Sequence, residues 1–263
     1  MARLEYVLRG IKSQQAKSRP GKCLQLPITP DLLIKIREAW EQDAHNFNKI
    51  MLWAAVCPVF WGFLRAGEMT VPSLNGYDEG YHLNFDAIAV DNHSNPSLLW
   101  VRIKGSKTGP FREGANIFLR RAHNKLCQVE TMLAYLAVRG SAPGFLFKFA
   151  DGHLLTKERF TKEVREALLA KGVKAELYAG HSFRIGAATT AAKHGICDST
   201  IKMLGRWESS TIHQDPKRSS SKDHKDHQLI EYTVLPYAIQ NVKLPMICYV
   251  LVPLTITALC RFT

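Results

Sequence analysis

The 263-residue sequence predicts a mostly helical α+β fold in which three short strands interrupt the helices. Apolar residues recur at helical spacing, and plausible caps precede them, over most of the first 205 residues. Between about residues 85 and 119 the pattern changes to short runs of strand type. Hydrophobic content of 46% and charged content of 22% are ordinary for a globular protein. The chain is long enough for one large or two small domains.

The first helix is expected to begin at residues 29–31, Thr-Pro-Asp. Threonine is a good N-cap, proline suits the first helical position, and an early acid favours the helix dipole. Its buried stripe comprises Leu32, Leu33, Ile36 and Trp40. A second, very apolar helix is expected over residues 47–64, with a kink at Pro58. Arg65 is expected at its end, where Gly67 breaks the pattern.

Strands are predicted at residues 85–90, 98–103 and 115–119. A glycine-rich turn, residues 104–110, separates the last two strands. Helices follow over residues 126–138, 156–171 and 181–194, and a short helix capped by Asp198 or Ser199 runs through Leu204. Glycines at 172 and 195 are expected to end two of them.

The net charge of +12 favours a polyanionic partner, and nucleic acid is the first candidate. A merely basic soluble protein is the alternative. Residues 211–263 hold six Lys/Arg and four Asp/Glu, so the first 210 residues carry 12 − 2 = +10. The six cysteines form no C-x-x-C pair, which argues against a zinc ribbon. The N-terminus has no apolar signal-peptide core, so we expect free thiols and an intracellular location.

Four short blocks carry chemically capable residues: Leu64–Glu68, Ser106–Gly109, Gly180–Gly186 and Leu204–Trp207. Among them, Arg65 and Arg184 can each donate paired hydrogen bonds to phosphate oxygens. His181 lies three residues before Arg184, on the same face of a helix, and can donate or shuttle a proton. These residues suit the binding of a phosphodiester without a metal.

Further roles follow from the same chemistry. Lys107, in the turn between strands, is the first choice for a general acid, and Lys104 is the alternative. Trp207 can donate its indole N–H to a phosphate oxygen, and Glu68 can orient Arg65 or His181. Each residue alone also has an ordinary explanation as an exposed helix face, a turn lysine, a surface acid or plain core. The combination and its order carry the hypothesis.

These four blocks resemble the catalytic domain of tyrosine recombinases, also called phage-type integrases. The amino-acid sequences of the four blocks most resemble those of the eukaryotic mobile-element branch, such as Crypton or DIRS-type elements. The resemblance covers about residues 28–210 and implies a mostly helical α+β catalytic domain with a small three-stranded antiparallel sheet. Residues 1–27 then read as a remnant of the N-terminal core-binding domain and a linker, and residues 211–263 as an atypical tail.

The resemblance also implies an activity, DNA recombination or integration. Tyrosine recombinases cut one strand, form a 3′-phosphotyrosyl bond and rejoin a different strand, with no metal or nucleotide cofactor. The expected partner is double-stranded DNA, with self-association on the DNA and no small-molecule substrate. The expected location is intracellular, in the nucleus.

The chain departs from the family at the nucleophile. The family's tyrosine follows shortly after the tryptophan block, yet residues 208–216 contain none. The next candidates are Tyr232 and Tyr237, beyond a low-complexity stretch at residues 215–227 that is expected to be disordered. A decayed element or an altered reading frame would explain the change in composition. The chain is then an impaired recombinase or a DNA-binding remnant that cannot cut; a type IB topoisomerase-like enzyme is a variant of the first.

The tail has two further features. Residues 244–260 carry no charge, but Pro245 and Pro253 interrupt them, so a weak C-terminal membrane anchor is the less favoured interpretation. His213, His224 and His227 include an H-x-x-H pattern without matching cysteines or carboxylates. A solvated polar run is the preferred interpretation, and no metal site is predicted.

Overall fold

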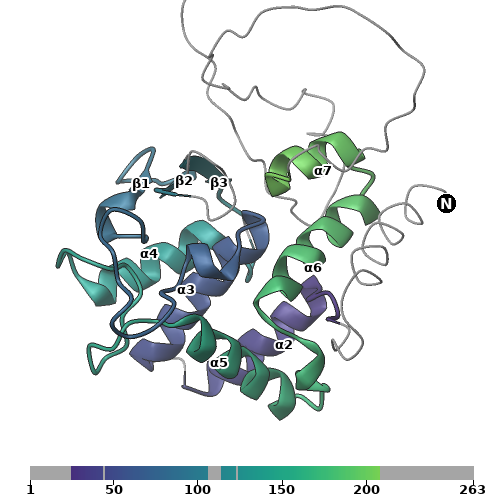
Figure 1. Cartoon of the computed structure of the whole chain (residues 1–263), viewed down its shortest axis with the longest axis horizontal. Coiled ribbons are helices and arrows are strands. Elements are labelled where there is room, and N and C mark those ends of the chain that lie inside the picture. The colour runs from purple at the N-terminus through teal and green to yellow at the C-terminus, as the bar shows by residue number, and fades with distance from the viewer. Residues whose placement is uncertain (1–24, 44, 106–113, 123, 208–263) are drawn as a thin grey trace, which may run out of the picture.

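A computed structural model of the protein describes residues 25–43, 45–105, 114–122 and 124–207. These residues form a helical body with a small sheet at one end, at the upper left of Figure 1. Helix α3 (Phe47–Trp61) runs through the interior and packs against α4 (Gln128–Arg139) and α6 (Gly180–Lys193). The mostly helical α+β architecture predicted from the sequence is confirmed.

Helix α2 (Pro30–Trp40) begins where its sequence predicts. The Thr29 hydroxyl accepts a hydrogen bond from the Leu32 backbone N–H at 3.4 Å, and Pro30 takes the first helical position. Leu33, Ile36 and Trp40 are buried and Leu32 is half-buried, so the predicted stripe faces the core. A short 3₁₀ turn, η1 (Glu41–Asp43), follows.

Helix α3 ends earlier than predicted, at Trp61 rather than at residue 64. Gly62 follows it, and Phe63 adopts a left-handed φ of 51°, which takes the chain out of the helical path. Arg65 is therefore not the end of the apolar helix. It directly precedes a separate 3₁₀ turn, η2 (Ala66–Glu68). Pro58 lies inside α3 as expected.

The sheet contains β1 (Ile88–Val90), β2 (Leu98–Ile103) and β3 (Ala115–Arg120), in the order β1-β2-β3 with both pairings antiparallel. The first strand is shorter than predicted because residues 85–87 form a 3₁₀ turn, η3 (Phe85–Ala87). One face of the sheet is buried, through Leu99, Val101, Ile103, Ile117 and Leu119. The residues between them in sequence point to the opposite face.

The remaining helices are α4, α5 (Lys157–Ala170), α6 and α7 (Asp198–Gly205), with a 3₁₀ turn, η4 (Ala175–Leu177), before α6. The Thr156 hydroxyl caps α5 by accepting from Arg159 N–H at 3.1 Å. Gly172 and Gly195 follow helices with φ of 71° and 81°, which suits their predicted role as stops. The predicted cap of α7 was wrong: Cys197 holds the N-cap position and Asp198 is the first helical residue.

Helix α6 packs closely against the segment that leads into α2. A Cβ atom on Gly186 would lie 1.7 Å from the carbonyl oxygen of Ile28. Ile28 N–H donates to the Ser182 carbonyl at 3.0 Å. Only glycine permits this approach, so α6 is fixed against the N-terminal part of the described chain.

Several predictions concern residues outside the described ranges. These are the division after residue 210, the tail anchor and the histidines at 213, 224 and 227; the division after residue 27 lies within the described residues and stays a prediction. None of the helices in the described ranges has the length and apolar character needed to cross a bilayer. Within those ranges no three His, Cys, Asp or Glu side chains gather as a metal site would require. Cys57, Cys127 and Cys197 are free thiols.

Candidate functional site

Glu68 holds Arg65 in a fixed position at the turn η2. The Arg65 backbone N–H donates to Glu68 Oε2 at 2.8 Å, and Arg65 Nη1 donates to Glu68 Oε1 at 3.1 Å. The Glu68 side chain is only 8% exposed, whereas 32% of the Arg65 side chain is accessible. Arg65 is therefore oriented by a buried carboxylate while its side chain stays partly exposed.

Glu68 also binds a second arginine that the sequence reasoning did not assign. Arg206 Nη2 donates to Glu68 Oε2 at 2.7 Å, across 138 residues of sequence. Arg206 lies directly after α7 with a left-handed φ of 51°, so it turns back toward η2. The available signal was its place inside the Leu204–Trp207 block, one residue before the tryptophan. The contact joins two of the predicted blocks.

The third block reaches the same place through Gly180, the first residue of α6. A Cβ atom on Gly180 would lie 2.7 Å from Ala66 Cβ, so glycine lets the start of α6 pack against η2. His181 and Arg184 follow on this helix. The structure thus brings Arg65, His181 and Arg184 together.

Arg184 is almost completely buried, with 1% of its surface exposed. Its Nη2 donates to the Gly205 carbonyl, and its guanidinium carbon lies 4.6 Å from the centroid of the Trp207 ring. Its Nη1 is buried and has no hydrogen-bond partner among the described residues. The guanidinium is therefore anchored on one side and unsatisfied on the other.

Trp207 lies across the end of α7, and Gly205 makes room for it. A Cβ atom on Gly205 would be 2.1 Å from Trp207 Cζ3. The ring is half-buried and covers Arg184 as a cation–π partner. The observed contact uses the face of the ring, and the indole N–H contact with phosphate stays a prediction.

The site is strongly cationic. Burial, followed by the nearby Arg65 and Arg206, lowers the pKa of Arg184 to about 9, and Glu68 opposes this shift. Desolvation lowers the pKa of His181 as well, and Arg184, Arg65 and Lys157 act in the same direction. His181 remains solvent-accessible, but the surrounding protein excludes part of its hydration. The neighbouring cations repel one another and lower both pKa values. A bound anion would relieve this repulsion, so the site favours an anion.

Lys157 is a further member of this group that sequence reasoning missed. It is the first residue of α5, and its backbone N–H donates to the Val71 carbonyl at 3.0 Å. Its ammonium is one of the charges that lower the pKa of His181. A lysine at a helix start looks like any exposed surface charge in the sequence, so no local signal marked it.

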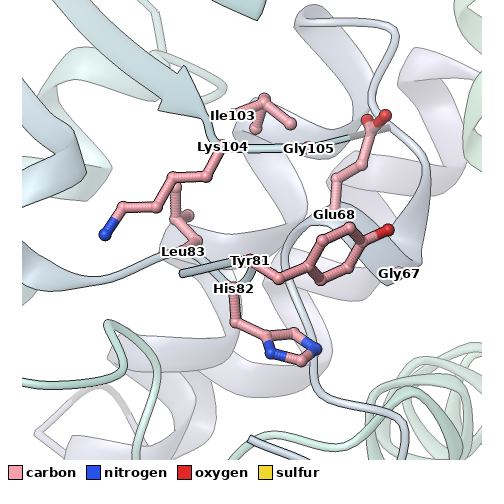
Figure 2. Close-up of a pocket in the computed structure, with 8 residues that line it drawn as sticks. All are labelled: Gly67, Glu68, Tyr81, His82, Leu83, Ile103, Lys104 and Gly105. Atoms are coloured by element: carbon pink, nitrogen blue, oxygen red, sulfur yellow. The ribbon is translucent and has the colours of Figure 1, made fainter. Parts of the chain in front are cut away.

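A small pocket adjoins Glu68 at the end of β2 (Figure 2). It is lined by Gly67, Glu68, Tyr81, His82, Leu83, Ile103, Lys104 and Gly105. Lys104 Nζ donates to the Glu79 carbonyl at 3.2 Å and pairs with Asp86 at 3.7 Å, and its side chain points away from Glu68 in Figure 2. The structure therefore places Lys104 near the site but binds its ammonium elsewhere.

The other predicted catalytic residues, Lys107, Tyr232 and Tyr237, lie outside the described residues. Of the described tyrosines, Tyr77 donates to Asn84 Oδ1 at 2.7 Å and Tyr135 to the Leu146 carbonyl at 2.8 Å. Tyr178 is buried. Tyr81 lines the pocket beside Glu68.

Comparison with known proteins gave structural matches only. No family model and no curated protein matches the chain. Among solved structures, XerA recombinase matches with 15% identity and a TM-score of 0.45, over 72% of this chain and 56% of that one. XerH recombinase bound to its difH substrate matches with 16% identity and a TM-score of 0.47, over 72% of this chain and 49% of that one. A lambda integrase dimer bound to a core site matches with 18% identity and a TM-score of 0.47, over 81% of this chain and 55% of that one. The chain spans about half the length of these proteins.

Proposed function

We propose that this chain is the catalytic domain of a tyrosine recombinase, and that Arg65, His181, Arg184 and Trp207 hold one phosphodiester of double-stranded DNA. The observation that carries this proposal is the buried Arg184 guanidinium with an unsatisfied Nη1. A buried donor without a partner costs about 1–3 kcal/mol, so its presence calls for an explanation. An incoming phosphate oxygen would supply the missing acceptor.

The surroundings of Arg184 favour an anion of this shape. Gly205 and Trp207 fix the plane of the guanidinium before any ligand arrives, so little conformational entropy is lost on binding. Arg65 offers a second, partly exposed guanidinium, and Glu68 holds it in place. Two planar cations can share the non-bridging oxygens of one phosphate, where charge accumulates as phosphorus becomes five-coordinate.

The proposed reaction is strand transfer. A tyrosine hydroxyl oxygen attacks phosphorus, the bond from phosphorus to the 5′-oxygen breaks, and a 3′-phosphotyrosyl link conserves the bond energy. Lys107 would protonate the departing 5′-oxygen, with Lys104 as the alternative. His181, whose lowered pKa keeps the imidazole neutral near pH 7, would accept the proton that the tyrosine hydroxyl loses as its oxygen attacks. Tyr232 and Tyr237 are the nucleophile candidates from the sequence. Membership of the eukaryotic mobile-element branch and self-association on DNA belong to the same proposal.

A second candidate function is that of a DNA-binding remnant. The sequence observation that favours it is the lack of a tyrosine in residues 208–216, where the family places its nucleophile. Such a chain would use the same arginines to bind the phosphate without cutting. The two functions differ in one product, a covalent protein–DNA complex.

The deciding experiment mixes the full chain with a nicked suicide duplex and looks for a covalent complex on a denaturing gel. Tyr81→Phe, Tyr232→Phe and Tyr237→Phe identify the nucleophile if a band forms. A band lost in one of them and in Arg65→Gln establishes cleavage through a phosphotyrosyl link, the first step of strand transfer. No band on the suicide duplex or on random-sequence duplexes, with duplex binding intact, favours the remnant.

Duplex binding itself tests the phosphate site. Arg65→Gln is the main variant, because its partly exposed side chain can change without opening the core. Lys35→Gln on the exposed face of α2 removes the same charge away from the site. Arg65→Gln should weaken duplex binding several-fold more than Lys35→Gln. Equal effects would contradict the proposed site.

A further inference from the structure

The outer face of the sheet carries a pair of aromatic rings, of which Trp100 is exposed and Phe118 is half-buried. Trp100 on β2 is the direct cross-strand partner of Phe118 on β3. Their ring centroids are 5.6 Å apart with planes inclined by 25°, so the rings are stacked. Trp100 is 40% exposed, while its sequence neighbours Leu99 and Val101 are fully buried on the core side. The stacked rings thus lie on a surface that the described chain leaves open.

Two arginines flank this pair. Alternation along each strand places Arg102 and Arg120 on the same outer face, and both are exposed. The register pairs Arg102 with Asn116 and Arg120 with Leu98, so the arginines lie at opposite ends of the aromatic pair. The face is therefore an apolar, aromatic centre between two cations.

Three acidic side chains, on η3, on α4 and just after β1, have contacts of their own. Asp86 pairs with Lys104 at 3.7 Å, and Glu130 pairs with Arg121 at 3.3 Å. The carboxylate of Asp91 accepts hydrogen bonds from the Ser97 hydroxyl and from the Ser97 and Leu98 backbone N–H groups.

We propose that this outer face, formed by Trp100, Arg102, Phe118 and Arg120, binds single-stranded DNA. Unpaired bases stack on exposed aromatic rings, and flanking arginines contact the phosphates. In a duplex the bases are stacked on each other, so their faces cannot reach Trp100. The positive charge at both ends fits a polyanion better than the mixed rim of a protein interface.

The face is continuous with the candidate site along β2. Strand β2 carries Trp100 and Arg102 and ends at Ile103, and both Ile103 and the next residue, Lys104, line the pocket beside Glu68 (Figure 2). Four residues of strand span about 13 Å, which matches about four nucleotides of a stacked strand. A strand separated near the phosphate site can therefore reach the aromatic pair. The binding proposed here does not depend on cleavage.

The test measures binding of fluorescently labelled (dT)20 to the full chain by anisotropy. Trp100→Leu keeps an apolar side chain but removes the aromatic face, and should weaken binding about ten-fold. Trp100→Phe keeps a stacking ring and should stay within about three-fold of the unchanged protein. Val138→Ala, at another exposed apolar position, should have no effect. Thermal unfolding of each variant verifies that the fold is retained.

Charge is tested separately. Arg102→Gln should weaken (dT)20 binding and reduce the slope of log K against log salt by about 0.7, while Lys35→Gln leaves both unchanged. Trp100→Leu should leave duplex binding, which Arg65→Gln weakens, nearly unchanged, because duplex bases cannot stack on the ring, so the two proposals fail independently. If Trp100→Leu and Arg102→Gln bind (dT)20 like the unchanged protein, the proposal is wrong. Loss of self-association in sedimentation without loss of (dT)20 binding would instead assign the face to a second copy.

Discussion

A single buried carboxylate organises the residues of the candidate site. Glu68 receives Arg65 through both its backbone and its side chain, and it receives Arg206 from the far end of the described chain. An isolated buried charge would be costly, but two arginines and a backbone N–H satisfy it. The Arg65 side chain stays partly exposed while Glu68 holds it in position.

Glu68→Gln should destabilise the protein by about 2 kcal/mol, because it leaves Arg206 and Arg65 without their shared counter-ion. The partial exposure of both arginines keeps the loss below that of a fully buried pair. Chemical denaturation monitored by circular dichroism measures it. Glu166→Gln, which breaks an exposed 3.8 Å pair with Lys162, should cost less than about 0.5 kcal/mol. Equal losses in the two variants would contradict this role for Glu68.

His181 should make duplex binding dependent on pH. Its pKa is lowered in the free protein, so the imidazole is neutral at pH 7, while a bound phosphate favours the protonated ring. Binding then takes up a proton, and affinity rises as pH falls toward the lowered pKa of His181 in the free protein. Anisotropy titrations from pH 8 to 5.5 should show a steeper rise for the unchanged protein than for His181→Asn. His93→Asn, at an exposed position, should follow the unchanged protein.

The lowered pKa of His181 has the opposite effect on folding, because acidification then reduces the free energy of unfolding. Because the unfolded chain has the higher pKa at His181, it binds more protons than the folded chain as pH falls below about 6.5. Free energy of unfolding is therefore lost on acidification through this window. His181→Asn removes that loss, so its stability should be less sensitive to pH over the same range.

At the scale of elements, α7 determines how the last block meets the others. The helix ends at Gly205. Arg206, whose backbone is left-handed, and Trp207 follow it. Each of these residues has a different contact: Gly205 accepts from Arg184, Arg206 binds Glu68, and Trp207 covers Arg184. A short helix thus delivers three consecutive residues to two blocks.

Gly205→Ala should disrupt this end of α7. The added Cβ would lie 2.1 Å from the Trp207 ring, so the ring must leave Arg184. We expect duplex binding to weaken about ten-fold and Trp207 emission to shift to longer wavelength. Gly80→Ala is the control, since its Cβ would meet only Asp78 Oδ1 at an ordinary 3.4 Å. Unchanged emission in Gly205→Ala would show that the ring is not held by this contact.

Sequence reasoning worked for elements whose signals are local. Thr29 and Thr156 cap the helices that follow them, and β2 spans the predicted residues 98–103. It failed where the backbone itself decides. Helix α3 ends at Trp61, and the positive φ of Phe63 turns the chain away from the helical path before Arg65. Nothing in the apolar pattern marks Phe63 as the turning point. Cys197 occupies an N-cap position although its neighbours are better cap formers.

At the scale of the whole molecule, positive charge dominates. The chain carries +12, and 12 − 2 = +10 of it belongs to the first 210 residues. The candidate site adds a local concentration of cations around Arg184. Long-range attraction of DNA and its specific capture by the site are therefore separable contributions.

Salt should separate them. The logarithm of the duplex binding constant should fall linearly with the logarithm of salt concentration, by about 0.9 for each phosphate contact. Arg65→Gln should reduce this slope by about 1, because it removes one phosphate contact. Lys35→Gln should leave the slope unchanged. Equal slopes for all three proteins would show that Arg65 makes no phosphate contact.

The convergence of the site was predictable from the sequence only in part. The sequences of the four blocks and their order along the chain indicated which residues to group. The structure brings Arg65, His181, Arg184 and Trp207 together. Arg206 and Lys157 were missed, because their roles depend on contacts between distant segments. A pattern of residues along one chain does not reveal which surface charges meet in space.

The link between Glu68 and Arg206 has a consequence for how such chains diverge. Loss of the arginine leaves a buried acid short of a cation, and loss of the acid leaves two cations facing each other. Either single change is therefore costly to inherit, whereas a joint replacement by neutral partners is tolerated more readily. Positions 68 and 206 should accordingly change as a pair across descendants of a common ancestor, although 138 residues separate them.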